Sequence, residues 1–167
     1  STFLPNQFFN NKDVLIIGNN NSLNKNKIKI SHLINKKKVF CISINKNKFI
    51  NENLIDMIVL AHPLRFMSQI NLLKNFKSSL VFPYSFLEKK ISNNKIITNK
   101  SYNYELNLNR SGKIKVSHKE CSLPILLGIG YAISLAISRK CKNIYLAGIN
   151  ISNLKNRFDY SRELIHE

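Results

Sequence analysis

Residues 13–23 constrain the fold more than any other segment, because an apolar run there ends at a tight turn and enters a helix. Four consecutive apolar residues, Val14–Ile17, are followed by Gly18 and a cluster of asparagines. This pattern is typical of a strand that is covered on both faces in a parallel sheet. The helix begins near Ser22, and its first N–H groups have no partners inside it. Since phosphorylated ligands bind at this edge of open α/β sheets, the segment predicts a ligand class, with a turn that binds nothing as the alternative.

Apolar strands alternate with helical patterns along the rest of the chain. Pro63 suits the first turn of one helix, and Ser122 followed by Pro124 predicts the start of another. Residues 101–117 alternate polar and apolar side chains and then turn at Ser111 and Gly112. This order predicts a Rossmann-like three-layer α/β sandwich with a mainly parallel sheet. Further strands are expected at residues 39–44, 56–61, 80–82, 95–98 and 143–147, and helices at 24–36, 65–76, 86–91 and 123–139.

Length and composition favour a single α/β domain. The 167 residues suffice for one compact core, and a hydrophobic content of 44% excludes a disordered chain. We expect residues 1–12 to be a lead-in that packs on the domain edge and residues 13–167 to form the domain. No apolar run approaches the ~20 residues that a membrane-spanning helix needs. The missing initiator Met and the chain end soon after a helix near Tyr160 predict a fragment of a larger protein.

Cysteine usage indicates a reducing compartment. Cys41, Cys121 and Cys141 are widely spaced and form no Cys-x-x-Cys pair, which favours a reduced interior over a disulfide framework or a zinc site. The chain also does not begin with the basic and apolar pattern of a secretory signal peptide. The expected location is therefore cytoplasmic.

The net charge of +17 raises the question of a polyanionic partner. Most of the excess is lysine scattered among asparagine and isoleucine, a texture that an A/T-rich genome produces. Arginine, which contacts bases and phosphates through two hydrogen bonds, is scarce, and no RNA-binding motif occurs. We therefore do not expect a nucleic acid partner, and a non-catalytic basic binding module is kept as an alternative.

Polar residues at the carboxyl ends of the predicted strands form a candidate binding set. Because these ends converge on one crevice in a doubly wound sheet, residues distant in sequence can contact one ligand. Their asparagine and serine groups suit a sugar, a base or a phosphate, and the set contains no carboxylates or Cys/His clusters that would hold a metal. We therefore predict no metal and no cofactor; a solvated turn residue is the alternative at each position. The set comprises Asn19, Ser22, Asn45, His62 and Asn150.

Two histidine-containing segments are candidates for chemistry. His62, next to Pro63 and Arg65 at a strand-to-helix junction, can donate to a phosphate or act as a general base, and capping or packing against the helix is the alternative. The second segment, residues 118–122, is expected at a helix N-terminus. A nucleophile there, Cys121 or Ser122, is a weaker hypothesis because Ser122 already serves as the predicted cap.

Taken together, residues 14–22, 54–65, 121–124 and 144–148 resemble a known family. They are similar to the C-terminal Rossmann-like domain of 4-hydroxy-2-oxovalerate aldolase-like (HMG-CoA lyase-like) two-domain proteins of bacterial surface-polysaccharide gene clusters. The similarity covers nearly the whole chain, and its most specific parts are His-Pro-x-Arg and Cys-Ser-Leu-Pro. The first and last segments more distantly resemble single-domain bacterial sialyltransferases, in which such positions hold a CMP-sugar.

The resemblance implies a domain that binds a nucleotide sugar or a sugar phosphate and is associated with 2-keto sugar acid and surface-polysaccharide biosynthesis. It implies attachment to an aldolase barrel, since this chain is too short to contain the barrel on which aldol chemistry resides. The alternative is a CMP-sugar-dependent glycosyltransferase with His62 as its base, so enzymatic activity is left open. The implied pocket residues are Gly18, Asn19, Ser22, Asn45 and Ser122, and we add Arg65, Gly148 and Asn150 from their positions.

The chain departs from the family pattern at two places. Asn20 and Asn21 replace a glycine and a proline in the first turn, which changes how closely the backbone can approach a phosphate. Asn150 replaces the acidic residue that follows the last strand. An inactive copy of the domain is therefore a further alternative.

Overall fold

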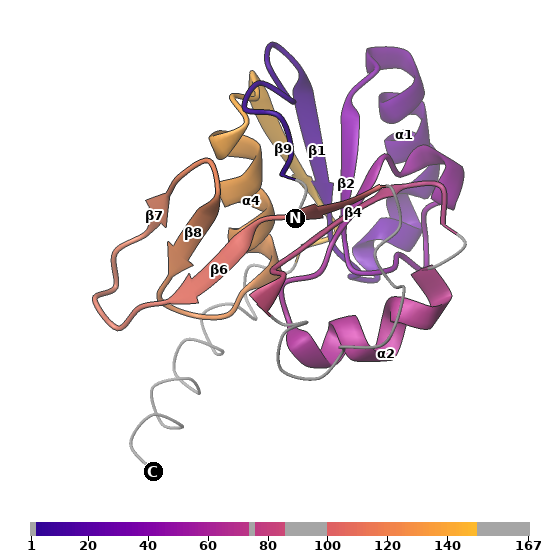
Figure 1. The fold of residues 1–167 in the computed structure, drawn as a ribbon. Coiled ribbons are helices and arrows are strands. Elements are labelled where there is room, and N and C mark those ends of the chain that lie inside the picture. Colours follow the sequence, from indigo (N-terminus) through magenta and orange to yellow (C-terminus); the bar gives the residue numbers. More distant parts are fainter. Residues whose placement is uncertain (1–2, 74–75, 86–99, 150–167) are drawn as a thin grey trace.

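The main body of the protein is a six-stranded parallel sheet with helices on both faces, a Rossmann-like α/β sandwich (Figure 1). The computed structural model describes residues 3–73, 76–85 and 100–149. The strand order is β5-β4-β3-β2-β1-β9. The strands are β1 (Asp13–Ile17), β2 (Phe40–Ile44), β3 (Met57–Val59), β4 (Ser79–Phe82), β5 (Ser101–Asn103) and β9 (Asn143–Ala147).

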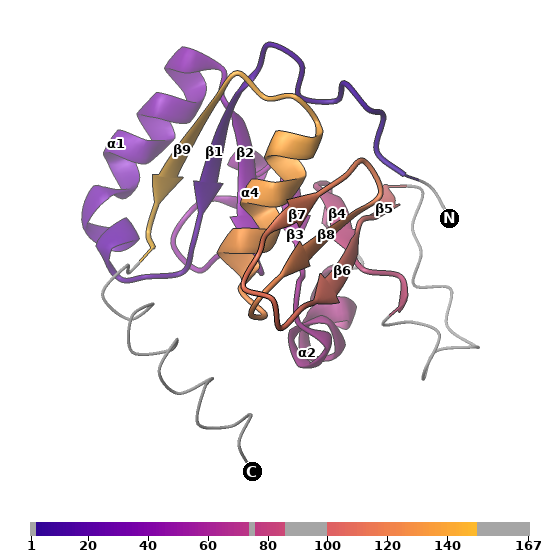
Figure 2. The same cartoon turned by 90° about the vertical axis from the view of Figure 1, so that its left-hand side faces the viewer.

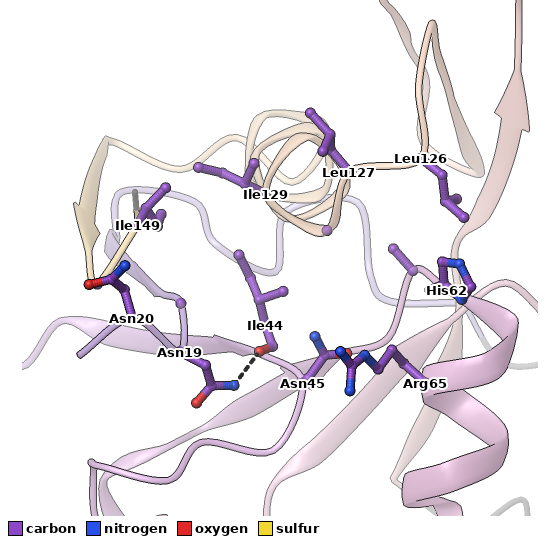
Figure 3. A pocket seen from close by; sticks show the side chains of 14 residues that line it. Asn19, Asn20, Ile44, Asn45, His62, Arg65, Leu126, Leu127, Ile129 and Ile149 are labelled. Atoms are coloured by element: carbon purple, nitrogen blue, oxygen red, sulfur yellow. Dashed lines mark hydrogen bonds between the residues drawn. The ribbon is translucent and has the colours of Figure 1, made fainter. Parts of the chain in front are cut away.

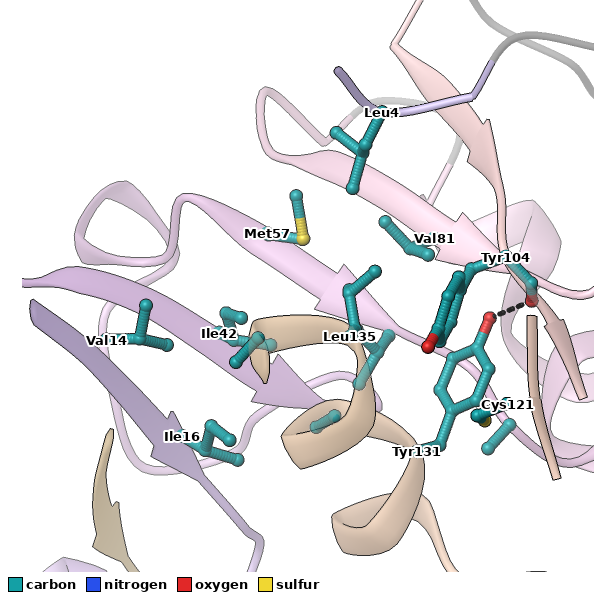
Figure 4. Packing of buried hydrophobic residues seen from close by; sticks show 14 of the residues in the cluster. Leu4, Val14, Ile16, Ile42, Met57, Val81, Tyr104, Cys121, Tyr131 and Leu135 are labelled. Carbon is teal, nitrogen blue, oxygen red and sulfur yellow. Dashed lines mark hydrogen bonds between the residues drawn. The ribbon is translucent and has the colours of Figure 1, made fainter. Parts of the chain in front are cut away.

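The two faces of the sheet are covered by different helices because strand side chains alternate in direction. Leu15 and Ile17 point into a core shared with α1 (Ser22–Lys37) and α2 (Pro63–Leu73). Val14 and Ile16 point into the opposite core, which α4 (Gly128–Ser138) covers (Figure 4). The apolar run Val14–Ile17 is therefore buried on both faces of the sheet, as its lack of polar positions predicted.

The chain reverses its direction of travel across the sheet next to β1. Strands β1 to β5 follow one another toward one edge, whereas β9 is placed on the other side of β1 and pairs with it in parallel from Asp13↔Asn143 to Ile17↔Ala147. In open α/β sheets this reversal separates the loops beyond the carboxyl ends of the two strands and leaves a crevice between them. The topology thus places a candidate site beyond Ile17 and Ala147.

A small three-stranded sheet packs beside α4 and accounts for the alternating segment (Figure 2). Its strand order is β6-β8-β7, from β6 (Glu105–Leu108), β7 (Lys115–Val116) and β8 (Glu120–Leu123). The predicted turn is present, with Gly112 at a φ of 70°. The first part of the segment, β5, instead joins the main sheet.

The last predicted helix starts later in the structure than at Leu123. Residues 120–123 form β8, whose backbone pairs with β6 and β7, so tertiary pairing overrides the local cap signal. Ser122 accepts a hydrogen bond from the Asn109 side chain (2.8 Å) and does not cap a helix. The residue at the N-cap of α4 is Leu127.

The lead-in segment is part of the fold at the amino ends of the strands. Phe9 is fully buried, and its ring lies 5.0 Å from that of Phe40 on β2. Its N–H donates to the Arg139 carbonyl after α4, and Lys142 N–H donates to the Lys12 carbonyl before β1. The short helix expected at 86–91, the strand at 95–98, residue Asn150 and the helix from Tyr160 lie outside the described residues.

The three cysteines are free, and two are inside the core. Burial raises the pKa of Cys41 to about 12 and that of Cys121 to about 11. The hypothesis of a nucleophile with a lowered pKa at Cys121 is therefore wrong, because this residue is in β8 under α4 and not at a helix N-terminus. None of the helices in the described ranges combines the length and apolarity that crossing a membrane requires.

Candidate functional site

A cavity of about 450 Å³ opens beyond the carboxyl ends of β1, β2, β3 and β9 (Figure 3). Six of the predicted site residues line this crevice: Gly18, Asn19, Asn45, His62, Arg65 and Gly148. Ser22, the first residue of α1, and Ser122 in β8 are not among the lining residues, and Asn150 lies outside the described part of the chain. The rest of the lining consists of Asn20, Ile44, Ala61, Leu126, Leu127, Gly128, Ile129 and Ile149.

Two glycines let the ends of β1 and β9 remain in contact past the sheet. Gly18 N–H donates to the Ala147 carbonyl (2.9 Å), and Asn20 N–H donates to the Gly148 carbonyl (3.1 Å). A Cβ on Gly18 would overlap the Gly148 carbonyl oxygen, and one on Gly148 would overlap the Leu23 side chain. Gly148 also has a φ of 64°, a left-handed conformation that favours glycine. These residues form the crevice floor through backbone packing.

The N-terminus of α1 is closed by its own turn. Asn20 Oδ1 accepts the Ser22 N–H (2.9 Å), the Asn20 carbonyl accepts Leu23 N–H, and the Asn21 carbonyl accepts Asn24 N–H (both 3.0 Å). The first three N–H groups of the helix are thereby satisfied within the chain. The expected phosphate cradle at this turn is therefore already occupied by asparagine oxygens.

The N-terminus of α4 borders the same crevice, and no other group of the described residues accepts a hydrogen bond from its first-turn N–H groups. Its first-turn N–H groups, on Gly128, Ile129 and Gly130, have no carbonyl partner within the helix. Leu127 at the N-cap provides no side-chain hydrogen bond, and the first turn holds no acidic residue. A Cβ on Gly128 would lie 2.6 Å from Ile44 Cγ2, so glycine allows this backbone to lie close against the end of β2.

His62 caps α2, as the structural alternative for this residue predicted. Its Nδ1 accepts the Leu64 N–H (3.2 Å), and its carbonyl accepts the Phe66 N–H (2.9 Å). With Nδ1 as the acceptor, a neutral imidazole carries its proton on Nε2. The ring is half-buried at the crevice wall and in this tautomer is a hydrogen-bond donor.

Asn45 and Arg65 both line the crevice, and their side chains are labelled in Figure 3. Asn45 is half-buried and has a φ of 62°, a conformation uncommon outside glycine, while Arg65 is exposed. Two hydrogen bonds hold the Asn45 backbone: its N–H donates to the Val59 carbonyl (3.0 Å), and its carbonyl accepts the Ser43 hydroxyl (2.7 Å). Among the described residues no hydrogen bond engages the Asn45 carboxamide.

One side of the crevice is apolar, and the other carries the Arg65 guanidinium and neutral polar side chains. Leu126, Leu127 and Ile129 at the start of α4 form the apolar side with Ile44 and Ile149, as the labelled side chains in Figure 3 show. Among the described residues of the lining, Arg65 is the permanently charged group and none carries a carboxylate. Within the described ranges no cluster of three or more His, Cys, Asp or Glu side chains is placed to hold a metal ion.

Sequence reasoning missed the α4 wall of the crevice. Residues 126–129 were predicted inside a longer helix, a position that gave no reason to expect them at a binding site. The signal that was present is the pair Gly128 and Gly130, since glycines are poor residues for a helix interior but suit its close-packed first turn. Comparison of the chain with protein-family models, with curated proteins and with solved structures found no match.

Proposed function

We propose that this chain binds a nucleotide-linked or phosphorylated sugar in the crevice at the carboxyl ends of β1, β2, β3 and β9. The observation that carries the proposal is the open N-terminus of α4 bordering a cavity that Arg65 also lines. A cavity of about 450 Å³ suits a small organic ligand. In keeping with the resemblance, we place the domain in 2-keto sugar acid and surface-polysaccharide biosynthesis in the cytoplasm, attached to an aldolase barrel.

An anionic group fits between the first turn of α4 and Arg65. The three N–H groups, which have no partner among the described residues, and the positive end of the helix dipole favour a phosphate. A guanidinium can donate two parallel hydrogen bonds to the same phosphate. The lining carries no carboxylate that would repel the anion. The apolar wall formed by Leu126, Leu127 and Ile129 then covers the face of a sugar or base, and Asn45 donates or accepts at its polar edge.

A second candidate function is a CMP-sugar-dependent glycosyltransferase, which the position of His62 in the crevice favours. As a base, His62 would need its Nε2 free of a proton, and the Nδ1–H tautomer that provides this gives up the hydrogen bond from Leu64 N–H. As a donor, the present tautomer can stabilise negative charge that develops on a departing phosphate. Release of CMP from a CMP-sugar, lost in His62→Ala, is the result expected of this activity; unchanged turnover in that variant removes His62 from the mechanism.

Calorimetry tests the binding proposal. The 167-residue chain is titrated with CMP, a CMP-linked sugar acid, a phosphorylated keto acid and inorganic phosphate. We expect at least one organic ligand to bind and Arg65→Ala to weaken it about tenfold or more, since hydrogen bonds to charged groups contribute ~1.5–3 kcal/mol. Arg110→Ala is the matched control, because Arg110 is exposed and does not line the crevice. A folded sample that binds none of the panel contradicts the proposal.

A further inference from the structure

Two asparagine side chains tie the β1–α1 turn to the loop after β2 in both directions. From the turn, Asn19 Nδ2 donates to the Lys46 carbonyl (2.9 Å) and to the Ile44 carbonyl (3.3 Å), and its Oδ1 accepts the Lys48 N–H (3.2 Å). From the loop, Asn47 Nδ2 donates to the Gly18 carbonyl (2.8 Å). We call Asn19 and Asn47 the asparagine clasp.

The loop of residues 45–50 is also held from its other side. Lys46 N–H donates to Gln69 Oε1 on α2 (2.9 Å). Within the loop, Asn47 Oδ1 accepts the N–H groups of Phe49 (2.9 Å) and Ile50 (3.0 Å), and the Ile50 side chain is buried. The carboxamide of Asn47 therefore has two separable tasks: its oxygen shapes the loop locally, and its nitrogen joins the loop to the turn.

This loop begins with Asn45, the crevice residue whose carboxamide has no hydrogen-bond partner among the described residues. Asn45 is in the left-handed conformation, which asparagine adopts more readily than other non-glycine residues but which still depends on the hydrogen bonds around it. The residue that follows, Lys46, is the one fixed by Asn19 and by Gln69. The clasp thus acts on the backbone directly after Asn45, whose side chain lines the crevice (Figure 3).

We infer that the asparagine clasp is a positioning device for the ligand: it fixes the loop so that Asn45 presents its carboxamide to the crevice. This inference rests on the proposed function and assigns Asn19 a different part from the one expected of it, since its side-chain nitrogen and oxygen both bond to the end of β2 and the loop that follows. Asn19 and Asn47 determine affinity through Asn45 and do not contact the ligand through their side chains.

The substitution Asn47→Asp separates the two tasks of Asn47. The carboxylate keeps an oxygen for Phe49 and Ile50 N–H but removes the donor to the Gly18 carbonyl. We expect the affinity for CMP, the probe, to fall about tenfold, which corresponds to the loss of one well-formed hydrogen bond. In the ligand-free chain, the ¹³Cα and ¹³Cβ shifts of Asn45 should lose their left-handed signature, and Lys48 N–H should exchange with solvent at least tenfold faster.

Asn51→Asp is the matched control for charge. Asn51 is in the same connection, and its Oδ1 accepts only the local Asn53 N–H (3.0 Å), which a carboxylate retains. This variant adds the same negative charge without cutting a link between the loops, so CMP affinity should change less than twofold. Repeating both titrations at high salt separates the two effects further, because added salt screens an exposed charge and does not restore a lost hydrogen bond.

The outcomes distinguish failure of the inference from failure of the proposed function. If the unmutated chain binds CMP and Asn47→Asp binds it equally well, or if the Asn45 shifts do not change, the clasp does not position Asn45 and the inference is wrong. If the folded, unmutated chain binds none of CMP, a CMP-linked sugar acid and a phosphorylated keto acid, the proposed function fails and the ligand role of the clasp fails with it. Changes in the Asn45 shifts would then show that the clasp is structural only.

Discussion

Two helices begin at the same crevice, and their N-termini have opposite hydrogen-bonding states. In α1 the first three N–H groups are used by Asn20 and Asn21, so the turn that the sequence marks most clearly is closed to an anion. In α4 the first turn has no cap from the Leu127 side chain, and its N–H groups have no partner among the residues that the structure describes. The comparison teaches that a glycine-asparagine turn after a first strand identifies the fold, whereas the anion site depends on which helix start remains unsatisfied.

A larger residue at Gly128, the start of α4, should have the largest effect on stability and ligand affinity. In Gly128→Ala the new Cβ meets Ile44 Cγ2 at 2.6 Å, so the helix start must move away from β2. We expect unfolding free energy to fall by about 1–3 kcal/mol, as for other overpacked sites, and ligand affinity to fall about tenfold or more. Chemical denaturation and calorimetry measure the two effects.

Gly130→Ala is the control within the same turn. Its Cβ would lie 3.2 Å from the end of the flexible Leu123 side chain, and alanine favours the helix by up to ~1 kcal/mol over glycine. Equal losses of affinity in both variants would show that the loss does not come from moving the helix start away from β2.

Removing the Asn20 side chain frees an N–H group at the start of α1 and tests whether this helix can bind the anion instead. Asn20→Ala removes the oxygen that accepts the Ser22 N–H, and we expect a loss of about 1 kcal/mol of unfolding free energy, similar to the loss of a helix cap. Phosphate-containing ligands should bind with affinity changed less than twofold, because their anion is placed at α4. A strong gain or loss of affinity in this variant would move the anion to α1.

The reactivity of Cys121 tests where α4 begins. Burial raises its pKa from 9.0 to about 11, so roughly one molecule in a thousand carries the thiolate at pH 8. Iodoacetamide at pH 8 should modify Cys121 far more slowly in the native chain than after denaturation. Rapid native alkylation would instead match a cysteine exposed at a helix N-terminus.

The raised pKa also gives a direction for the pH dependence of stability. The unfolded thiol ionises near pH 9, whereas the folded thiol resists ionisation up to about pH 11. Its contribution to stability is therefore fully present below pH 9 and is lost as the pH rises toward 11. The thermal midpoint should fall less across this range in Cys121→Ala than in the unmutated chain.

Changing the far end of α4 should have the smallest effect. The Arg139 side chain is fully buried, donates to Ser138 Oγ (3.3 Å) and has its guanidinium carbon 5.7 Å from the Tyr104 ring centroid. Its Nε and Nη2 have no hydrogen-bond partner among the described residues. Arg139→Met removes this charge, and we expect the unfolding free energy to change by less than about 1 kcal/mol. Relief of the desolvation cost of the buried charge offsets the lost cation–π contact.

Ligand affinity in Arg139→Met shows whether binding depends on the first N–H groups of α4 or on the dipole of the whole helix. The influence of a helix dipole falls off within its terminal turns, so a charge at the opposite end should leave binding in the crevice unchanged. A tenfold change in calorimetric affinity would contradict the local account. The same titration also verifies that the substituted chain is folded.

The sequence predicted the sheet well because strands that are buried on both faces are continuous apolar runs. The apolar run Val14–Ile17 and the strand at residues 143–147 were placed correctly, as was the helix after Ser22. The start of α4 was not, because the Ser122 cap signal is local, whereas the pairing that makes residues 120–123 a strand is with segments up to fifteen residues earlier.

The candidate site was predicted in its location but not in the roles of its residues. Strand ends converge in this topology, and hence Gly18, Asn45 and His62 all line the crevice. Composition cannot tell an asparagine whose side chain is tied to a loop, such as Asn19, from one whose side chain is left to face the crevice, such as Asn45. That distinction depends on partners 25 to 29 residues away in the chain.

A titration followed by ¹H–¹⁵N spectra measures most directly which helix start receives the anion. CMP is added to the uniformly labelled chain, with cytidine as the control that lacks the phosphate. The account predicts that CMP shifts the backbone N–H signals of Gly128, Ile129 and Gly130 and that cytidine does not, while those of Ser22, Leu23 and Asn24 remain in place. Shifts confined to Ser22–Asn24, with the α4 signals unchanged, would contradict it.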